Sequence, residues 1–468
     1  MSFSALRNVM FTASILLASA AAALAGDDGS ISPKVAKSLR DSVKIKGSTR
    51  ALQNALTAAD AKTLAVNRAI LQGHNNVFNH KIKAKGITNQ KSSGRCWLFA
   101  SLNILRPAVI EKYKLEGFEF SQSYLAFWDK LEKANCFLEF MIELGDRKPL
   151  DRELDFFVKD PIPDGGWWRY VVALVDKYGV MPQEIMPETY SSEHTSTMNK
   201  ILQNKLRVDA VKLRGMVAKK KPMAEIRAAK QKMLAEVYRI LVLNYGRPPS
   251  EFSYRYVDKD KKVSEMKKYT PQSFYKEWVG EDLSQYVNLC NDPTQPYNKH
   301  YRMRRIKNIM GTPEMYYVNV PIKVLKDLAA KALMDDQPVL FAADAGKDMD
   351  REKGIMQLGL YDYASIYGVD LKLSKADSLR VRHGVANHAM VFIGVDMQDK
   401  KPVKWLVENS WGKDRGKGGF WTMYDKWFDE HLYSIIVKKA YVPNDVLKIY
   451  NEKAVELAPW SSMNLMCR

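Results

Sequence analysis

Cysteine and histidine are scarce in this chain, which holds four cysteines and seven histidines among 468 residues. Cys96, Cys136, Cys290 and Cys467 lie far apart, without the paired spacing of a zinc site or the regular framework of a disulfide-rich domain. The spacing leaves open one bridge, between Cys136 and Cys290. The sequence contains no Walker loop, the motif that would indicate a bound nucleotide. We therefore expect neither a metal nor another cofactor.

Long apolar runs are missing after residue 25, so no later segment is expected to span a membrane. At the start of the chain, Arg7 precedes an uncharged run rich in Ala, Leu, Ile and Val that ends in Ala23-Leu24-Ala25. A short run with an Ala-x-Ala end predicts a signal peptide over residues 1–25, cleaved before Gly26. The alternative is an uncleaved anchor, although a spanning helix needs about 20 apolar residues. We expect an exported protein, either periplasmic or secreted.

Acidic residues are outnumbered, with 53 Asp and Glu against 72 Lys and Arg and a formal net charge of +19. The segment from Asn199 to Leu243 has helical spacing, and between Lys200 and Arg239 it holds twelve basic and three acidic residues. Such a surplus attracts anionic envelope polymers, lipid surfaces or nucleic acid. Without zinc-finger spacing or an RNP pattern, no specific nucleic-acid recognition is expected. The basic stretch is either a solvated helical face or a surface for an acidic partner.

A reactive-cysteine motif, Gln-Lys-Ser-Ser-Gly-Arg-Cys-Trp-Leu-Phe-Ala-Ser, spans residues 90–101. The Ser-Gly pair bends the backbone, and the apolar residues after Cys96 predict a helix that starts there. A helix N-terminus stabilises a thiolate through its dipole and its unpaired N–H groups. A lone cysteine is more often an ordinary buried residue. Gln90 reverses that expectation, because its side-chain amide can donate to a developing oxyanion.

Hydrophobic spacing predicts several further elements around this motif. The elements are a helix from Cys96 to about Tyr113 in which Pro107 marks a kink or an earlier end, a loop over 161–166, a helix over 167–178 ended by Gly179, and a strand over 339–343. Residues 34–72 also have helical spacing with few breakers. The 468 residues, 46% of them hydrophobic, are enough for at least one substantial core.

Two apolar runs, 388–395 and 403–408, flank a polar turn and predict a β-hairpin. With the turn centred between Gln398 and Asp399, antiparallel pairing places His388 beside Asn409. No catalytic assumption enters this pairing. Taken singly, His388 could cap a strand and Asn409 could belong to a turn.

Acyl transfer by cysteine needs a thiolate, an imidazole, a group that orients the imidazole, and donors for the oxyanion. Cys96 supplies the nucleophile, His388 the imidazole and Asn409 the orienting carboxamide, while Gln90 donates to the oxyanion. Trp411, just beyond Asn409, is placed to shield the His–Asn hydrogen bond from water. The predicted reaction is therefore hydrolysis through an acyl-enzyme.

On these residues the chain resembles the papain-like cysteine peptidases, and more closely their bleomycin hydrolase and aminopeptidase C branch. The likeness extends over roughly Gly73 to Met463. The matching segments are Thr88–Trp97, Asp164-Gly165-Gly166, Lys177-Tyr178-Gly179-Val180, Asp344-Ala345-Gly346-Lys347, Tyr361-Asp362-Tyr363, Asn387–Met390 and Glu408–Gly412.

The resemblance implies an α+β, papain-like fold, with a helical left part, an antiparallel β-barrel-like right part and a large helical insertion. It implies an oxyanion hole formed by Gln90 and Cys96, and a substrate cleft lined by Gly165, Gly166 and Trp411. The expected divisions are a signal peptide over 1–25, a helical extension over 26–72 and a peptidase domain over 73–468, with the insertion at about 195–310 and a C-terminal arm at about 443–468.

The same resemblance implies an aminopeptidase that acts on peptide substrates as a homohexamer, with the C-terminal carboxylate meeting the substrate's free amino group. Two departures bear on this expectation. The ending Ser461–Arg468 differs from the small residues usual in the branch, and Trp167 replaces a usual Gln after the glycines. The alternatives are an endopeptidase with a displaced arm and a basic scaffold that binds anionic polymers.

Overall fold

The computed structural model describes residues 29–83 and 85–467. The predicted signal peptide over 1–25 lies outside the described residues. The chain forms two compact units, one running to Val66 and taking in Tyr361–Asp370, the other comprising Asn67–Leu360 and Leu371–Arg468. Within the described ranges, no helix combines the length and apolarity needed to cross a bilayer.

The first unit is a set of short helices: α2 (Pro33–Ser42), α3 (Gly47–Ala58), α4 (Ala61–Ala65) and α15 (Tyr363–Tyr367). Asp60 starts α4 by accepting a hydrogen bond from the Lys62 N–H at 2.7 Å. A segment distant in sequence completes the unit, because the Asp362 N–H donates to the Ala65 carbonyl at 2.7 Å. The helical character expected for residues 34–72 is present, whereas this return segment was not expected.

The second unit contains the remaining helices. They are α5 (Arg68–Gly73), α6 (Cys96–Lys112), α7 (Gln122–Glu143), α8 (Arg152–Lys159), α9 (Trp168–Tyr178), α10 (Tyr190–Glu193), α11 (Ser196–Ala218), α12 (Met223–Tyr245), α13 (Pro271–Phe274), α14 (Ile322–Met334), α16 (Lys375–Arg380), α17 (Asp425–His431) and α18 (Asn444–Ile449), with short turns η1 (Tyr275–Val279), η2 (Leu283–Gln285), η3 (Lys439–Tyr441) and η4 (Ser462–Cys467).

The strands of this unit form one large mixed sheet in the order β14-β5-β6-β4-β13-β7-β10-β11-β12-β9-β8, with β1 paired to β10 and a separate β2-β3 ribbon. Their bounds are β1 (His80–Lys81), β2 (Phe252–Tyr254), β3 (Lys267–Tyr269), β4 (Tyr286–Cys290), β5 (Lys299–Met303), β6 (Tyr316–Asn319), β7 (Val339–Ala343), β8 (Met349–Asp350), β9 (Ile355–Met356), β10 (His388–Gln398), β11 (Lys401–Glu408), β12 (Phe420–Tyr424), β13 (Leu432–Lys438) and β14 (Val455–Leu457).

Strand β10 shows why the core divides into two layers. Successive side chains of a strand point to opposite faces of its sheet. Val391 and Ile393 accordingly belong to the core that contains Leu98 of α6, and Met390 and Phe392 to the core that contains Leu325 of α14. A helix on each face buries this strand, so its sequence is apolar almost throughout.

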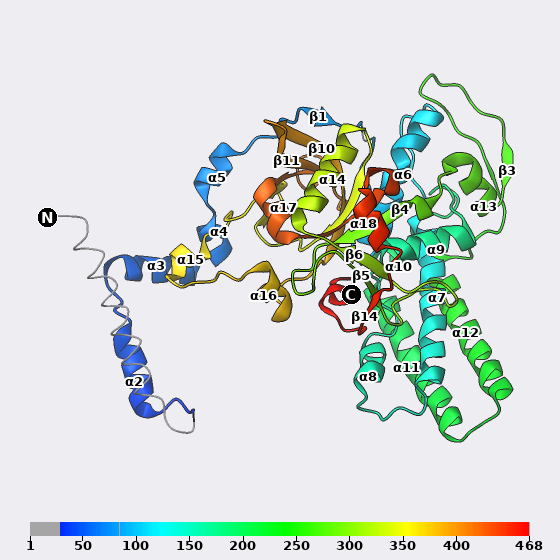
Figure 1. Ribbon diagram of the computed structural model, residues 1–468, viewed down its shortest axis with the longest axis horizontal. Helices are drawn as coiled ribbons and strands as arrows, with labels where there is room; N and C mark the ends of the chain where they lie inside the picture. Colours follow the sequence, from blue (N-terminus) through cyan, green and yellow to red (C-terminus); the bar gives the residue numbers. More distant parts are fainter. Residues whose placement is uncertain (1–28, 84, 468) are drawn as a thin grey trace. The chain divides into compact units, whose positions relative to one another are not determined.

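Three long helices, α7, α11 and α12, lie side by side below the sheet region in Figure 1. The predicted basic helical stretch is the pair α11 and α12, joined by a turn at Lys219–Pro222. The predicted helix after Cys96 is present and continues past Pro107 to Lys112 rather than ending early. Gly179, with a φ of 71°, ends α9 as expected.

The predicted hairpin register is wrong, although the hairpin itself exists. β10 pairs Val391 with Glu408 and Gln398 with Lys401, so the turn consists of Asp399 and Lys400. Both turn residues have positive φ, 48° and 61°, the conformation of a two-residue hairpin turn that matches strand twist. His388 instead faces Ala343 of β7, and Asn409 lies just after β11.

Candidate active site

Cys96 occupies the first position of α6, where the sequence placed it. Its sulfur is close to the backbone N–H groups of Ala389 and Trp97, which lower the pKa of the thiol, while burial raises it more strongly. Cys96 and His388 line the same cavity. The start of α6 and the start of β10 therefore meet at the thiol.

His388 and Asn409 are brought together by their side chains, not by strand pairing. The Nε2 atom of His388 lies 2.8 Å from Oδ1 of Asn409. Trp411 stacks on the imidazole, with ring centroids 4.6 Å apart and planes 30° apart. The carboxamide orients the ring without adding negative charge, and the indole covers the hydrogen bond.

Gln90 is fixed beside this group by a short pairing between residues 88–90 and 410–412. The Gln90 N–H donates to the Ser410 carbonyl at 2.8 Å, and Gln90 Oε1 accepts from Ser410 Oγ at 2.7 Å. Gln90 Nε2 donates to the Ser93 carbonyl at 2.6 Å. An amide NH₂ has two hydrogens, so one remains to donate into the cavity that Gln90 and Cys96 both line.

Burial governs the charges of the thiol and the imidazole. Burial, together with the Arg351 guanidinium and against the effect of the Asn409 hydrogen bond, lowers the pKa of His388 to about 4. Burial also raises the pKa of Cys96. Because each charge alone is disfavoured, thiolate and imidazolium are most stable when they form together.

A cavity of about 320 Å³ extends from Cys96 between α9 and the strands β4, β7 and β13. Gly165, Gly166 and Trp411 all line it, as do the apolar residues Trp168, Leu340 and Ile436. A Cβ atom added to Gly166 would lie 2.6 Å from the Trp97 ring, so a side chain there would displace that indole. Gly166 thus allows the Trp97 ring to pack directly against the loop that lines the cavity.

The loop that carries these glycines is held from behind by buried charges. Lys133 donates to the carbonyls of Pro163 and Gly165 at 2.9 and 2.7 Å. Trp97 Nε1 donates to the Asp164 carbonyl at 2.8 Å. These contacts tie the cleft wall to α6 and α7.

Asp164 joins the loop before Cys96 to the start of the insertion. Its carboxylate accepts from the Gly94 N–H at 3.0 Å, from Thr195 Oγ1 at 2.5 Å and from Asn199 Nδ2 at 2.8 Å, and it pairs with Lys130 at 2.5 Å. Burial alone would raise the pKa of Asp164, but the Lys130 ammonium and these donors hold it well below its usual range.

A profile of the Peptidase C1-like family matches residues 30–464, nearly the whole described chain. The chain belongs to the Peptidase C1-like family. It is therefore a cysteine peptidase with a papain-like α+β fold, as the sequence predicted. The match begins well before Gly73, so the family likeness also includes most of the N-terminal extension.

Curated relatives of this peptidase are similar over most of their length. Aminopeptidase C of Lactobacillus delbrueckii subsp. lactis is 38% identical over 83% of this chain and 88% of its own. Bleomycin hydrolase of Homo sapiens is 38% identical over 88% of this chain and 94% of its own. The crystal structure of pepw from lactobacillus rhamnosis hn001 has a TM-score of 0.91 at 37% identity, covering 94% of this chain and all of that one.

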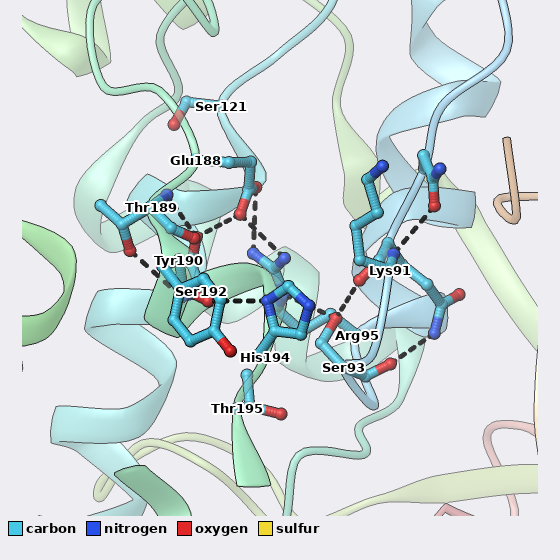
Figure 2. Close-up of polar contacts among 12 residues, drawn as sticks. Lys91, Ser93, Arg95, Ser121, Glu188, Thr189, Tyr190, Ser192, His194 and Thr195 are labelled. Atoms are coloured by element: carbon cyan, nitrogen blue, oxygen red, sulfur yellow. Dashed lines mark hydrogen bonds and ion pairs between the residues drawn. The ribbon is translucent and has the colours of Figure 1, made fainter. Parts of the chain in front are cut away.

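Beside the cysteine loop of this peptidase lies a polar network that the sequence did not reveal (Figure 2). Buried Arg95 forms a bidentate ion pair with Glu188 at 3.0 and 2.8 Å, and its Nε donates to Ser93 Oγ at 3.0 Å. Ser192 Oγ donates to the same Glu188 at 2.5 Å. The residue before the nucleophile is thus anchored to the segment that leads into α11.

Two further charged residues, one that lines the cavity and one that holds its glycine loop from behind, gave no signal in the sequence. Lys133 lies in the middle of α7 and Arg351 lies in the turn between β8 and β9. Neither belongs to a motif, and both reach the site only through long-range packing. Among the described residues, no group of three or more His, Cys, Asp or Glu side chains could hold a metal ion. Cys136 and Cys290 are both free thiols, so the bridge left open by their spacing is not formed.

Proposed function

We propose that this cysteine peptidase is an aminopeptidase that removes N-terminal residues from peptides through a Cys96–His388–Asn409 acyl-enzyme. The observation that carries the proposal is the 2.8 Å contact of His388 with Asn409 beneath Trp411, facing the cavity that Cys96 lines. The names of the relatives, aminopeptidase C among them, support the same class of substrate.

The geometry suggests how each group acts. The Cys96 sulfur, its proton passed to His388, attacks the scissile carbonyl carbon, and the oxyanion is stabilised by the Gln90 amide and the Cys96 N–H. The imidazolium then gives its proton to the leaving amine, which departs and leaves a thioester. Water, deprotonated by His388, attacks the thioester, releasing the acid product and regenerating the thiol–imidazole pair.

The C-terminal arm supports the restriction to N-terminal residues. Strand β14 lies parallel to β5, and Glu456 pairs with Arg302 and Arg304 at 2.7 and 3.3 Å. Farther along, Asn464 lines a small cavity of about 70 Å³ together with Gly165 and Gly166. The arm therefore reaches the loop whose two glycines also line the active-site cavity. An acid at the end of the cleft would select a cationic N-terminus.

We also propose that the enzyme is exported and forms a homohexamer. Export rests on the apolar run that precedes Gly26. Assembly is supported by large apolar side chains exposed on one face of α11, with Ile201 50%, Val208 45% and Val211 74% exposed. Exposed apolar stripes of this kind mark association surfaces.

The internal pairing of the basic helices weighs against a polymer-binding scaffold. Lys205 pairs with Asp209 at 2.5 Å and Glu236 at 2.6 Å, and both Arg227 and Lys230 bind Glu139. Arg214 donates to backbone carbonyls at the end of α7. Basic side chains that are already paired within the protein attract an external anionic polymer less strongly.

Matched reporter peptides with free and acetylated N-termini test the proposal, using the mature enzyme, the Cys96→Ala variant and a chain truncated after Met463. We expect the mature enzyme to cleave only the free reporter and Cys96→Ala to cleave neither. The truncated chain should gain activity on the acetylated reporter. Equal cleavage of both reporters by the mature enzyme would instead indicate an endopeptidase, and turnover by Cys96→Ala would exclude the proposed nucleophile.

A further inference from the structure

Arg351 lies at the edge of the active-site cavity without a catalytic assignment. It belongs to the exposed turn between β8 and β9, and its guanidinium carbon lies 4.9 Å from the centroid of the Trp411 ring. That ring also stacks on the His388 imidazole, 4.6 Å away between centroids, and meets the Trp421 ring edge-on at 5.5 Å. Arg351 also lines the cavity that contains Cys96.

The backbone holds the turn of Arg351 in place, and the neighbouring charges are already used. The Arg351 carbonyl accepts from the Gly416 N–H at 3.1 Å. On the same turn Glu352 pairs with Arg415, and Asp350 pairs with Lys353 at 3.1 Å. Within the part of the chain that the structure describes, no carboxylate lies within ion-pair distance of the Arg351 guanidinium. A cation fixed over an indole and facing a cavity is available to an anionic ligand.

The chemistry of the reaction identifies which part of a substrate lies nearest Arg351. His388 delivers a proton to the leaving nitrogen, so the leaving fragment must lie on the His388 side of the cavity. Trp411 and Arg351 continue that side outward. An extended chain advances about 3.5 Å per residue, so the α-carboxylate of a leaving fragment of one or two residues falls within a short distance of the scissile bond.

We propose that Arg351 is a specificity residue that binds a carboxylate of the leaving fragment. This inference rests on the proposed peptidase function. A carboxylate near the scissile bond has two sources, the α-carboxylate of a dipeptide or tripeptide and the side chain of an acidic residue that follows the scissile bond. The guanidinium forms parallel hydrogen bonds with either.

The test compares kcat/KM for matched substrates. One pair is Leu-Gly and its C-terminal amide, and a second is the amides of Leu-Glu-Gly and Leu-Gln-Gly. We expect the wild-type enzyme to favour the charged member of at least one pair about tenfold, and the pair that responds identifies the source. In Arg351→Gln the ratio should approach one, largely through KM, and in Arg351→Lys it should be intermediate.

Lys353→Gln is the matched control, because it removes a cation from the same turn at a position that does not line the cavity. Its substrate ratio should equal that of the wild type. Raising the ionic strength should reduce the wild-type preference, which tests the inference without any substitution. A role limited to covering Trp411 would lower all rates of Arg351→Gln alike and leave the ratio unchanged, which would overturn the inference.

The same data separate this inference from the proposed function. Cleavage of the four peptides with no preference for the charged member of either pair would reject the carboxylate site but leave the proposed aminopeptidase function intact. Failure of the wild-type enzyme to cleave any of the four peptides would reject the proposed function, and the role of Arg351 with it.

Discussion

At the scale of single residues, the site depends on pairing two groups that burial would otherwise keep neutral. Cys96 is a thiol whose pKa burial raises, and His388 is an imidazole whose pKa burial lowers to about 4. A helix N-terminus alone, the feature visible in the sequence, only partly offsets this burial. The imidazolium is therefore needed as the counter-ion of the thiolate.

His388→Ala tests that dependence through the rate at which iodoacetamide alkylates Cys96. Without the imidazole the thiolate must form alone, so alkylation should increase only as the pH rises above the ordinary thiol pKa of about 8.5. At pH 7 less than about 3% of such a thiol is ionised, and alkylation should be at least about 30-fold slower than in a wild-type thiolate–imidazolium pair. Similar rates for both proteins at pH 7 would show that His388 does not support the thiolate.

The sequence predicts which residues form the site better than it predicts how they are arranged. Motif chemistry and a hairpin predict Gln90, His388 and Asn409; the structure places Gln90 and His388 at one cavity and joins Asn409 to His388 by a hydrogen bond. The sequence does not predict Arg351 or Lys133 as site residues, because a single basic residue in a turn or a helix has no local pattern. Their positions depend on which distant segments pack together.

At the scale of elements, the hairpin shows what local spacing can and cannot predict. Alternating apolar residues indicated both strands, but the turn residues Asp399 and Lys400 adopt positive φ and shift the register by two residues or more from the predicted one. His388 nonetheless meets Asn409, because both lie at the same end of adjacent strands and their side chains span the difference. The return of residues 361–370 to the N-terminal helices had no local signal at all.

The Asp164 carboxylate bonds to both the cysteine loop and the start of the insertion. The Asp164→Ala variant tests how much these bonds stabilise the fold. The variant leaves Lys130 buried and unpaired, so the free energy of unfolding should fall by about 3–5 kcal/mol, measured by urea denaturation at pH 7. Asp160→Ala is the control, since Asp160 accepts only a 3.1 Å bond from Gln203 in the same region. A loss no greater than that of the control would show that the buried pair is not stabilising.

The pH dependence of the same interaction has a definite sign. The pKa of Asp164 is lower in the folded protein than in the unfolded chain. Its contribution is therefore complete above the ordinary carboxyl pKa of about 3.9 and is lost as the pH falls through the folded value. The difference in stability between the wild type and Asp164→Ala should accordingly shrink below about pH 4.

At the scale of the whole molecule, the insertion supplies the surface most suited to assembly. α11 and α12 pack on α7 through one side, and Ile201, Val208 and Val211 remain exposed on α11. In a lone chain these side chains would be in contact with water at a cost of about 25 cal/mol per Å² of apolar area. A second copy of the chain that covers these apolar side chains removes that cost. The basic residues nearby repel a surface that does not offer complementary charge.

Val211→Lys should therefore dissociate the proposed assembly, because it buries an unpaired ammonium within the apolar stripe, at its most exposed residue. Sedimentation velocity should show the proposed hexamer of the wild type replaced by smaller species, while circular dichroism stays unchanged because Val211 is exposed in the lone chain. Leu150→Lys is the matched control, since Leu150 is 95% exposed and lies outside the stripe; this variant should keep the wild-type mass. If Val211→Lys also keeps that mass, α11 does not form the interface and the oligomer must be sought on another surface.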